Sequence, residues 1–192
     1  MNPALISAIV LAGGYSSRMG CEKAELLFNG KSLVRHQVDL LLGIGIQDVL
    51  LSGYESAIPG TRFVPDRIAH RGPLSGIHSG LAAAEHRAAL VLAVDTPLVP
   101  PSLLIALMEA HTRGITIVSH CGNWEPLIGI YDTALVDKCE KILLGENSSI
   151  RLLFRQHPPR LLEYAGDARL LMNCNTPEDY TALLAYEEAD RS

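Results

Sequence analysis

The stretch LAGGYSSRMGCEK, residues 11–23, constrains the fold most, because it directly follows the apolar run at 8–10. A pattern typical of a buried strand there leads into two adjacent glycines, Gly13 and Gly14, and then into small hydroxyl residues. Glycines let the backbone turn with a positive φ and approach a ligand closely, so that successive N–H groups can point at phosphate oxygens. The pattern predicts a strand followed by an anion-binding loop.

Two basic residues strengthen this interpretation of the loop. Arg18 can bind phosphate as a rigid fork, whereas Lys23 is a mobile point charge. Five residues separate Gly14 from Gly20, one more than a Walker A loop has, and adjacent glycines do not fit the dinucleotide fingerprint. A nucleoside triphosphate is therefore the expected ligand. The alternative is a plain glycine turn between a strand and a helix, which would not explain why the two cations gather here.

The bulk properties limit the class of protein. A chain of 192 residues with 48% hydrophobic and 19% charged residues is expected to form one domain, residues 1–192, with a substantial core. The net charge of −5 argues against nucleic-acid binding. We expect a cytoplasmic protein without membrane contact, because no signal peptide is recognisable and no apolar run approaches the roughly 20 residues of a membrane span. The four cysteines are widely separated, which predicts neither a zinc site nor a disulfide framework.

Strand-like and helix-like segments alternate along the chain. Strands are expected at 5–11, 48–52, 62–64, 88–94, 115–119, 126–131, 160–164 and 170–174, and helices at 33–42, 73–85, 100–112, 133–144, 148–156 and from 177 onward. Such alternation predicts an α/β fold, a three-layer Rossmann-like domain with a mostly parallel central sheet and helices on both faces. Ligands of such sheets bind at the carboxyl ends of the strands.

Several polar residues stand at those expected strand ends. Asp95 follows the buried run at 90–94, and a carboxylate facing a triphosphate suits Mg²⁺; the alternative is that Asp95 only begins a turn before Thr96. Ser52 is either a polar group near a base or a simple strand terminus. Asp66 can accept hydrogen bonds from a nucleoside, and the glycine turn at 72–76 would bring a helix N-terminus toward an anion.

A pair of asparagines stands near the end of the chain. Asn173 and Asn175 lie two residues apart, so on a strand their side chains would share one face and could present paired amides to a heterocycle or a phosphate. The segment Thr176–Asp179 is also a good helix start, with Thr176 as its N-cap. A ligand-binding role and a capping role for the asparagines therefore both stay open.

Taken together, these segments resemble the molybdenum cofactor guanylyltransferases (MobA-type) of the nucleotidyltransferase superfamily. The matching segments span most of the chain in the order of that family: LAGGYSSRMGCEKA at 11–24, PD at 65–66, GPLSG at 72–76, VDTP at 94–97, EPL at 125–127 and NCNTPED at 173–179. This sequence departs from the family's pattern in two places, and both affect the expected base contacts more than catalysis. Ser52 stands where an amide is common, and the segment between Gly20 and Lys23 is longer in some relatives.

The resemblance implies a nucleotidyltransferase that uses Mg²⁺. It would transfer GMP from Mg·GTP to the terminal phosphate of molybdopterin, forming molybdopterin guanine dinucleotide and releasing pyrophosphate. GTP and molybdopterin are then its substrates, and the resemblance implies partner proteins that deliver molybdopterin or are molybdoenzymes. The alternatives are a cytidylyl- or sugar-phosphate nucleotidyltransferase and a non-catalytic relative that binds GTP.

The resemblance also implies a role for each candidate residue. The catalytic residues would be Arg18, Lys23 and Asp95, of which Asp95 would also bind the metal. Asn173 and Asn175 would lie on the pterin side. The remaining residues would bind the nucleotide together with Lys23 and Asp95: Leu11, Ala12, Gly13, Gly14, Ser52 and Asp66.

Overall fold

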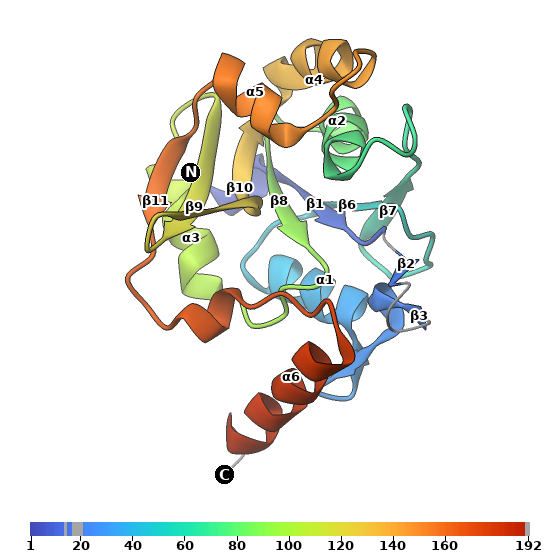
Figure 1. Ribbon diagram of the computed structural model, residues 1–192, viewed down its shortest axis with the longest axis vertical. Coiled ribbons are helices and arrows are strands. Elements are labelled where there is room, and N and C mark those ends of the chain that lie inside the picture. Colours follow the sequence, from blue (N-terminus) through green and yellow to red (C-terminus); the bar gives the residue numbers. More distant parts are fainter. Residues whose placement is uncertain (14, 17–20, 191–192) are drawn as a thin grey trace.

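The computed structural model describes residues 1–13, 15–16 and 21–190. Its centre is a seven-stranded sheet in the order β11-β9-β10-β8-β1-β6-β7 (Figure 1). Among the described strands of this sheet, β10 alone runs antiparallel to its neighbours. The mostly parallel sheet predicted from the sequence is thus confirmed. The strands are β1 (Ser7–Leu11), β6 (Asp48–Ser52), β7 (Thr61–Val64), β8 (Ala88–Ala93), β9 (Ile115–His120), β10 (Asn123–Asp132) and β11 (Arg160–Glu163).

Helices cover both faces of this sheet, which confirms the three layers (Figure 1). Alternate residues of β1 enter opposite cores: Ala8 and Val10 pack with α1 and α3, whereas Ile9 and Leu11 pack with α2, α4 and α5. This follows from the period-two alternation of a strand that is buried on both sides. The α-helices are α1 (Leu33–Gly43), α2 (Pro73–Ala83), α3 (Pro101–Ala110), α4 (Val136–Leu143), α5 (Ile150–Gln156) and α6 (Pro177–Asp190).

Smaller elements connect these layers. Two short hairpins pair β2 (Tyr15–Ser16) with β3 (Cys21–Glu22) and β4 (Leu27–Phe28) with β5 (Lys31–Ser32). Four 3-10 helices complete the described elements: η1 (Pro3–Leu5), η2 (Lys23–Glu25), η3 (Thr133–Leu135) and η4 (Ala168–Leu171). None of the helices in the described ranges is both long enough and apolar enough to cross a membrane.

Local sequence chemistry sets the starts of α1 and α6. The Ser32 hydroxyl accepts a hydrogen bond from the Arg35 N–H at the start of α1. At the start of α6, Thr176 Oγ1 accepts from the Asp179 N–H, and Asp179 Oδ2 accepts from the Thr176 N–H. This reciprocal pair satisfies N–H groups that the first turn of a helix leaves without partners. It confirms the capping role of Thr176.

The expected strand at 170–174 is wrong. The structure has η4 (Ala168–Leu171) there, and Asp167 caps it by accepting the Arg169 N–H. A run of five residues is too short for its periodicity to distinguish a strand from a helical turn. The sheet edge beside β9 is occupied by β11, so residues 170–174 pack as a connection instead. The expectation that Asn173 and Asn175 share a strand face therefore fails.

Candidate active site

The carboxyl ends of β1, β6 and β8 meet at one edge of the sheet. The Ala12 and Gly13 N–H groups both donate to Ser52 O, at 2.9 and 3.1 Å, and the Val94 N–H donates to Leu11 O at 3.0 Å. The segment after β1 is therefore held between the ends of its two neighbours. This is the edge at which ligands of parallel sheets bind.

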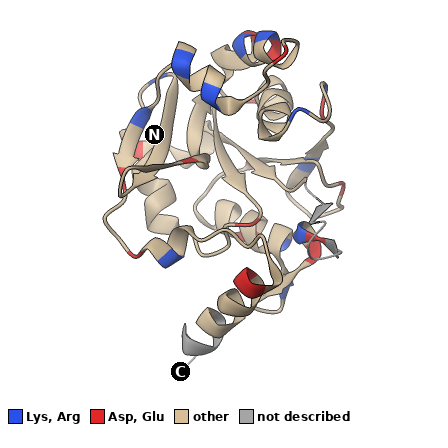
Figure 2. Cartoon of the chain, in the orientation of Figure 1, with Lys and Arg blue, Asp and Glu red and all other residues tan. Residues whose placement is uncertain are grey.

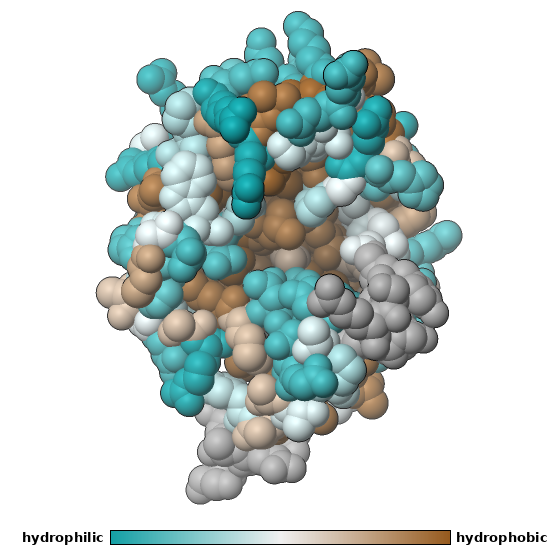
Figure 3. Space-filling model, in the orientation of Figure 1, coloured by the Kyte–Doolittle hydropathy of each residue, from teal (hydrophilic) through white to brown (hydrophobic). Residues whose placement is uncertain are grey.

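A cavity of about 600 Å³ opens at this edge, and Figure 3 shows the molecule hollowed near the centre of the face in view. It brings together six residues predicted from the sequence: Leu11, Gly13, Lys23, Ser52, Asp66 and Asp95. Its other lining residues come from the end of β8, from the loops after β6, β7 and β8, from the first turns of α2 and from β10: Gly53, His70, Gly72, Pro73, Gly76, Ala93, Val94 and Leu127. Gly14 and Arg18 lie outside the described residues.

Two glycines let the strand ends approach closely. A Cβ on Gly53, whose φ is +80°, would lie 2.4 Å from Gly13 Cα. The loops after β1 and β6 therefore pack backbone against backbone, which only glycine allows. Sequence reasoning missed Gly53. The available signal was a glycine that directly follows the polar end of a buried strand.

Gly53→Ala is expected to destabilise the protein by about 2–4 kcal/mol, because a positive φ and an overpacked contact both oppose the new methyl group. Gly114→Ala is the matched control: Gly114 also has a positive φ, +73°, but its Cβ would meet nothing within 4 Å. It should cost about 1 kcal/mol. Urea denaturation of both variants measures the difference, and equal losses would show that the contact with Gly13 costs nothing.

The charged centre of the site joins three distant segments. Lys23 Nζ lies 2.8 Å from Asp95 Oδ2 and 2.5 Å from Asn175 Oδ1. The Lys23 and Asp95 side chains are each 16% exposed, so they form a partly desolvated ion pair at the cavity wall. The Cys174 N–H donates to Asp95 O at 2.7 Å, which holds the approach to α6 against the end of β8. The structure thus places Asn175 beside the two predicted catalytic residues.

Another part of the cavity wall carries polar groups suited to a nucleoside. The Ser52 hydroxyl donates to Asp66 Oδ1 at 3.2 Å, and both residues line the cavity. Gly72 and Pro73, at the start of α2, line it as well, so the positive end of the α2 dipole borders the same space. One wall therefore offers acceptors for base or sugar hydrogens, and another offers a favourable environment for phosphate.

Two groups of predicted ligand-binding residues differ from the others in their surroundings. The Ala12 and Gly13 amides already donate to Ser52 O, so a phosphate would have to share these N–H groups or use the Gly14 amide, which is outside the described residues. Asn173 is half-buried and is not among the residues that line the cavity. The roles of these residues in ligand binding stay predictions.

The donor set at this edge suits a cation that is bound together with a nucleotide. The described residues contain no cluster of three or more His, Cys, Asp or Glu side chains that could hold a metal by itself. Asp95 supplies one carboxylate at the cavity wall. Mg²⁺ characteristically takes one or two carboxylates, and phosphate oxygens and water complete its shell. The residues present therefore fit a nucleotide-dependent divalent cation.

Known proteins share this sequence and this fold. The profile of the MobA-like NTP transferase domain matches residues 8–161. The chain is 35% identical to the molybdenum cofactor guanylyltransferase of Rhizobium meliloti, over 90% of this chain and 87% of that protein. Its fold matches molybdopterin-guanine dinucleotide biosynthesis protein A of Archaeoglobus fulgidus with a TM-score of 0.80 and 23% identity, over 97% and 99% of the two chains.

A Mycobacterium tuberculosis protein solved in complex with manganese has the same fold, with a TM-score of 0.65 and 17% identity over 94% of this chain and 98% of that one. The profile match covers most of the chain, and the fold places Leu11, Gly13 and Asp95 at one cavity. The chain therefore belongs to the MobA-like NTP transferase family and is a nucleotidyltransferase.

Proposed function

We propose that residues 1–192 act as a single domain that transfers GMP from GTP to the terminal phosphate of molybdopterin and releases pyrophosphate. The observation that carries this proposal is the contact of Lys23 with both Asp95 and Asn175 at the wall of the cavity. It supplies a cation, a carboxylate and an amide where a triphosphate and a second phosphate would meet. The names of the relatives support this choice of substrates, because those proteins are named molybdenum cofactor guanylyltransferases.

The chemistry asks for positioning and charge neutralisation rather than for a nucleophilic side chain. An oxygen of the acceptor phosphate attacks the α-phosphorus of GTP, a new P–O–P bond forms, and the bond to pyrophosphate breaks. Lys23 Nζ would donate hydrogen bonds to the crowded phosphate oxygens and offset their charge. Asn175, whose amide oxygen holds Lys23 in this structure, would keep the ammonium group aimed at that point.

Asp95 would hold a divalent cation, which we propose is Mg²⁺, and that cation would neutralise charge on the reacting and leaving phosphates. The manganese complex of a protein with this fold agrees with a divalent ion. Arg18 would add a further positive charge to the triphosphate. On the nucleoside side, Asp66 would accept hydrogen bonds from the base or the ribose, with Ser52 holding its carboxylate in place.

The proposed reaction also relates to the cellular location and the partner proteins. A cytoplasmic location stays a prediction, as do partner proteins that supply molybdopterin or receive the finished cofactor. The location and the partner proteins would both suit an enzyme whose two substrates are small phosphorylated molecules. The choice of nucleotide is the point that an experiment can decide first.

Pyrophosphate release tests the proposal. It is measured with Mg·GTP and with Mg·CTP, each with and without molybdopterin. Release that requires GTP and molybdopterin together is the expected result. A preference for CTP would contradict the choice of base and make the protein a cytidylyltransferase of the same fold. Binding of Mg·GTP without pyrophosphate release in the presence of molybdopterin or sugar phosphates would contradict catalysis and favour a binding protein.

A further inference from the structure

A second cavity, of about 630 Å³, lies beside the first. β10 pairs with β8 only from Ile128 onward, so its earlier residues extend past the carboxyl end of β8, where Asp95 follows. Pro126 lines the second cavity and Leu127 lines the first, so consecutive residues of β10 border both. The second cavity is lined by Gly122, Asn123, Trp124, Pro126, Arg151, Phe154 and Arg155.

The shape of β10 at this point is built into the fold. Its pairing with β9 shifts between Glu125 and Gly129, so the strand bulges away from β9 over residues 126–128. The buried Tyr131 hydroxyl donates to Pro126 O at 2.6 Å and holds the bulge in place. A proline inside a strand cannot donate to the ladder, which favours such a bulge. The bulge directs adjacent residues into the two cavities.

An aromatic pair forms one wall of the second cavity. Trp124, on β10, is 46% exposed, whereas Phe154, on α5, is 6% exposed. Their ring centroids lie 5.9 Å apart with the planes tilted by 58°. Phe154 therefore supports the indole within the range of favourable aromatic pairs and leaves much of its surface open. A large aromatic surface held in this way suits the stacking of a flat ring.

Two arginines stand beside this wall. Arg151 and Arg155 are four residues apart on α5, with Phe154 between them, so all three lie on one side of the helix. Figure 2 shows these positive charges on α5. Within the described residues, neither arginine forms an ion pair or a hydrogen bond. Like charges at this spacing oppose helix formation, so their placement at a cavity suits an electron-rich ligand.

We propose that this second cavity binds the ring end of the acceptor, a flat heteroaromatic system with carbonyl or anionic groups at its edge. The ring would stack on Trp124, and the arginine forks would bind its edge. The phosphate at the other end would then reach past Pro126 and Leu127 toward Asp95. This assignment rests on the proposed function for the identity of the acceptor, but the binding of a pterin ring tests it separately.

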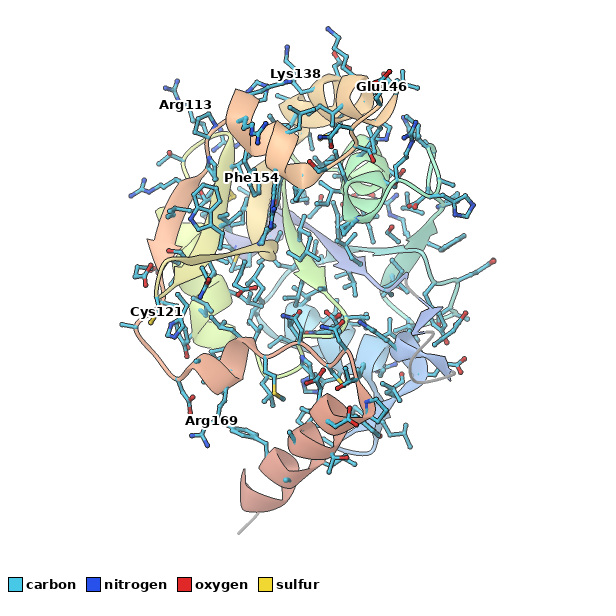
Figure 4. All side chains as sticks on the ribbon, viewed as in Figure 1. Arg113, Cys121, Lys138, Glu146, Phe154 and Arg169 are labelled. Carbon is cyan, nitrogen blue, oxygen red and sulfur yellow. The ribbon has the colours of Figure 1, made fainter. Side chains whose placement is uncertain are left out.

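Trp124 is the only tryptophan of the chain, so its fluorescence reports on this cavity directly. Neopterin monophosphate, added to the protein with saturating Mg·GTP, is expected to quench that emission in a saturable way. The double variant Arg151→Ala, Arg155→Ala should weaken binding about 10- to 100-fold. Arg113→Ala is the matched control, because Arg113 lies at the outer edge of the molecule (Figure 4) and does not line the second cavity. Loss of quenching when Mg·GTP is added would overturn the proposal, since the pterin would then occupy the nucleotide cavity.

Kinetics provide a second readout. Trp124→Ala should raise the KM for molybdopterin about 10- to 100-fold and leave the KM for GTP unchanged, and Trp124→Phe should restore most of the loss. Phe63→Ala, at an exposed aromatic on β7, is the control for surface truncation. An unchanged KM for molybdopterin in Trp124→Ala would overturn this assignment and leave the proposed function intact. Quenching that persists while no guanylyl transfer is detected would overturn the proposed function and leave this assignment intact.

Discussion

Asp95→Asn is expected to lower kcat by about 10³-fold at saturating Mg·GTP and acceptor. Asparagine has nearly the same shape as aspartate and its amide oxygen can still accept from Lys23, but it lacks the negative charge that would hold a divalent cation. The hydrogen bond from Cys174 goes to the backbone oxygen of Asp95, so the link between β8 and the α6 approach survives. Pyrophosphate release measures the loss, and thermal unfolding checks that the fold is kept.

A matched control for this variant is Asp39→Asn. Asp39 also pairs with basic side chains, Lys31 and Arg35, but it lies on α1 and does not line the active-site cavity. Its turnover should stay within about twofold of the wild type. The metal dependence gives a further readout, because Asp95→Asn should need more Mg²⁺ for half-maximal rate. A variant at Asp95 that turns over within tenfold of the wild type, with an unchanged Mg²⁺ requirement, would exclude Asp95 as the metal ligand.

Lys23→Ala is expected to lower turnover by about 10²- to 10³-fold, the loss typical of a single electrostatic stabiliser. Alanine removes the ammonium group that contacts both Asp95 and Asn175 and leaves the Asp95 carboxylate without its paired cation. The variant should therefore lose kcat more than it raises the KM for GTP. Single-turnover measurement of pyrophosphate release separates these effects, because it reports on chemistry apart from product release.

Lys31→Ala is the control for Lys23→Ala. Lys31 is likewise a lysine paired with an aspartate, Asp39, but it is exposed and lies outside this cavity. Its removal should leave the rate nearly unchanged. Near-normal turnover of Lys23→Ala would remove Lys23 from the mechanism and leave its contacts with Asp95 and Asn175 a structural role only.

Much of the fold was predictable because its central strands, β1, β6 and β8, are buried on both faces. The run at 88–94 is continuously apolar and is followed by Asp95, and the apolar run at 49–51 ends at Ser52. Each run identifies a buried strand, and the polar residue after it marks the end that a ligand would meet. The glycine loop after β1 and Asp95 after β8 could be placed at one edge for that reason. Parallel strands bring their carboxyl ends together whatever lies between them in the chain.

The features that the sequence analysis predicted wrongly or missed also have a physical cause. The run at 170–174 is short, and whether it joins the sheet depends on which strand already occupies the edge. Gly53 acquires its role from the backbone of Gly13, a contact that neither glycine reveals by itself. The aromatic pair of Trp124 and Phe154 likewise forms only because the fold brings α5 beside β10.

The sequence by itself determined the alternating layers, the loop that follows β1 and the polar residues at the strand ends, because periodicity and turn chemistry act between near neighbours. The tertiary structure decided that Asn175 reaches Lys23 across 152 positions, that Gly53 meets Gly13, and that a second cavity adjoins the first. Those contacts arise from the packing of whole elements, and no local pattern specifies which distant side chains that packing brings together.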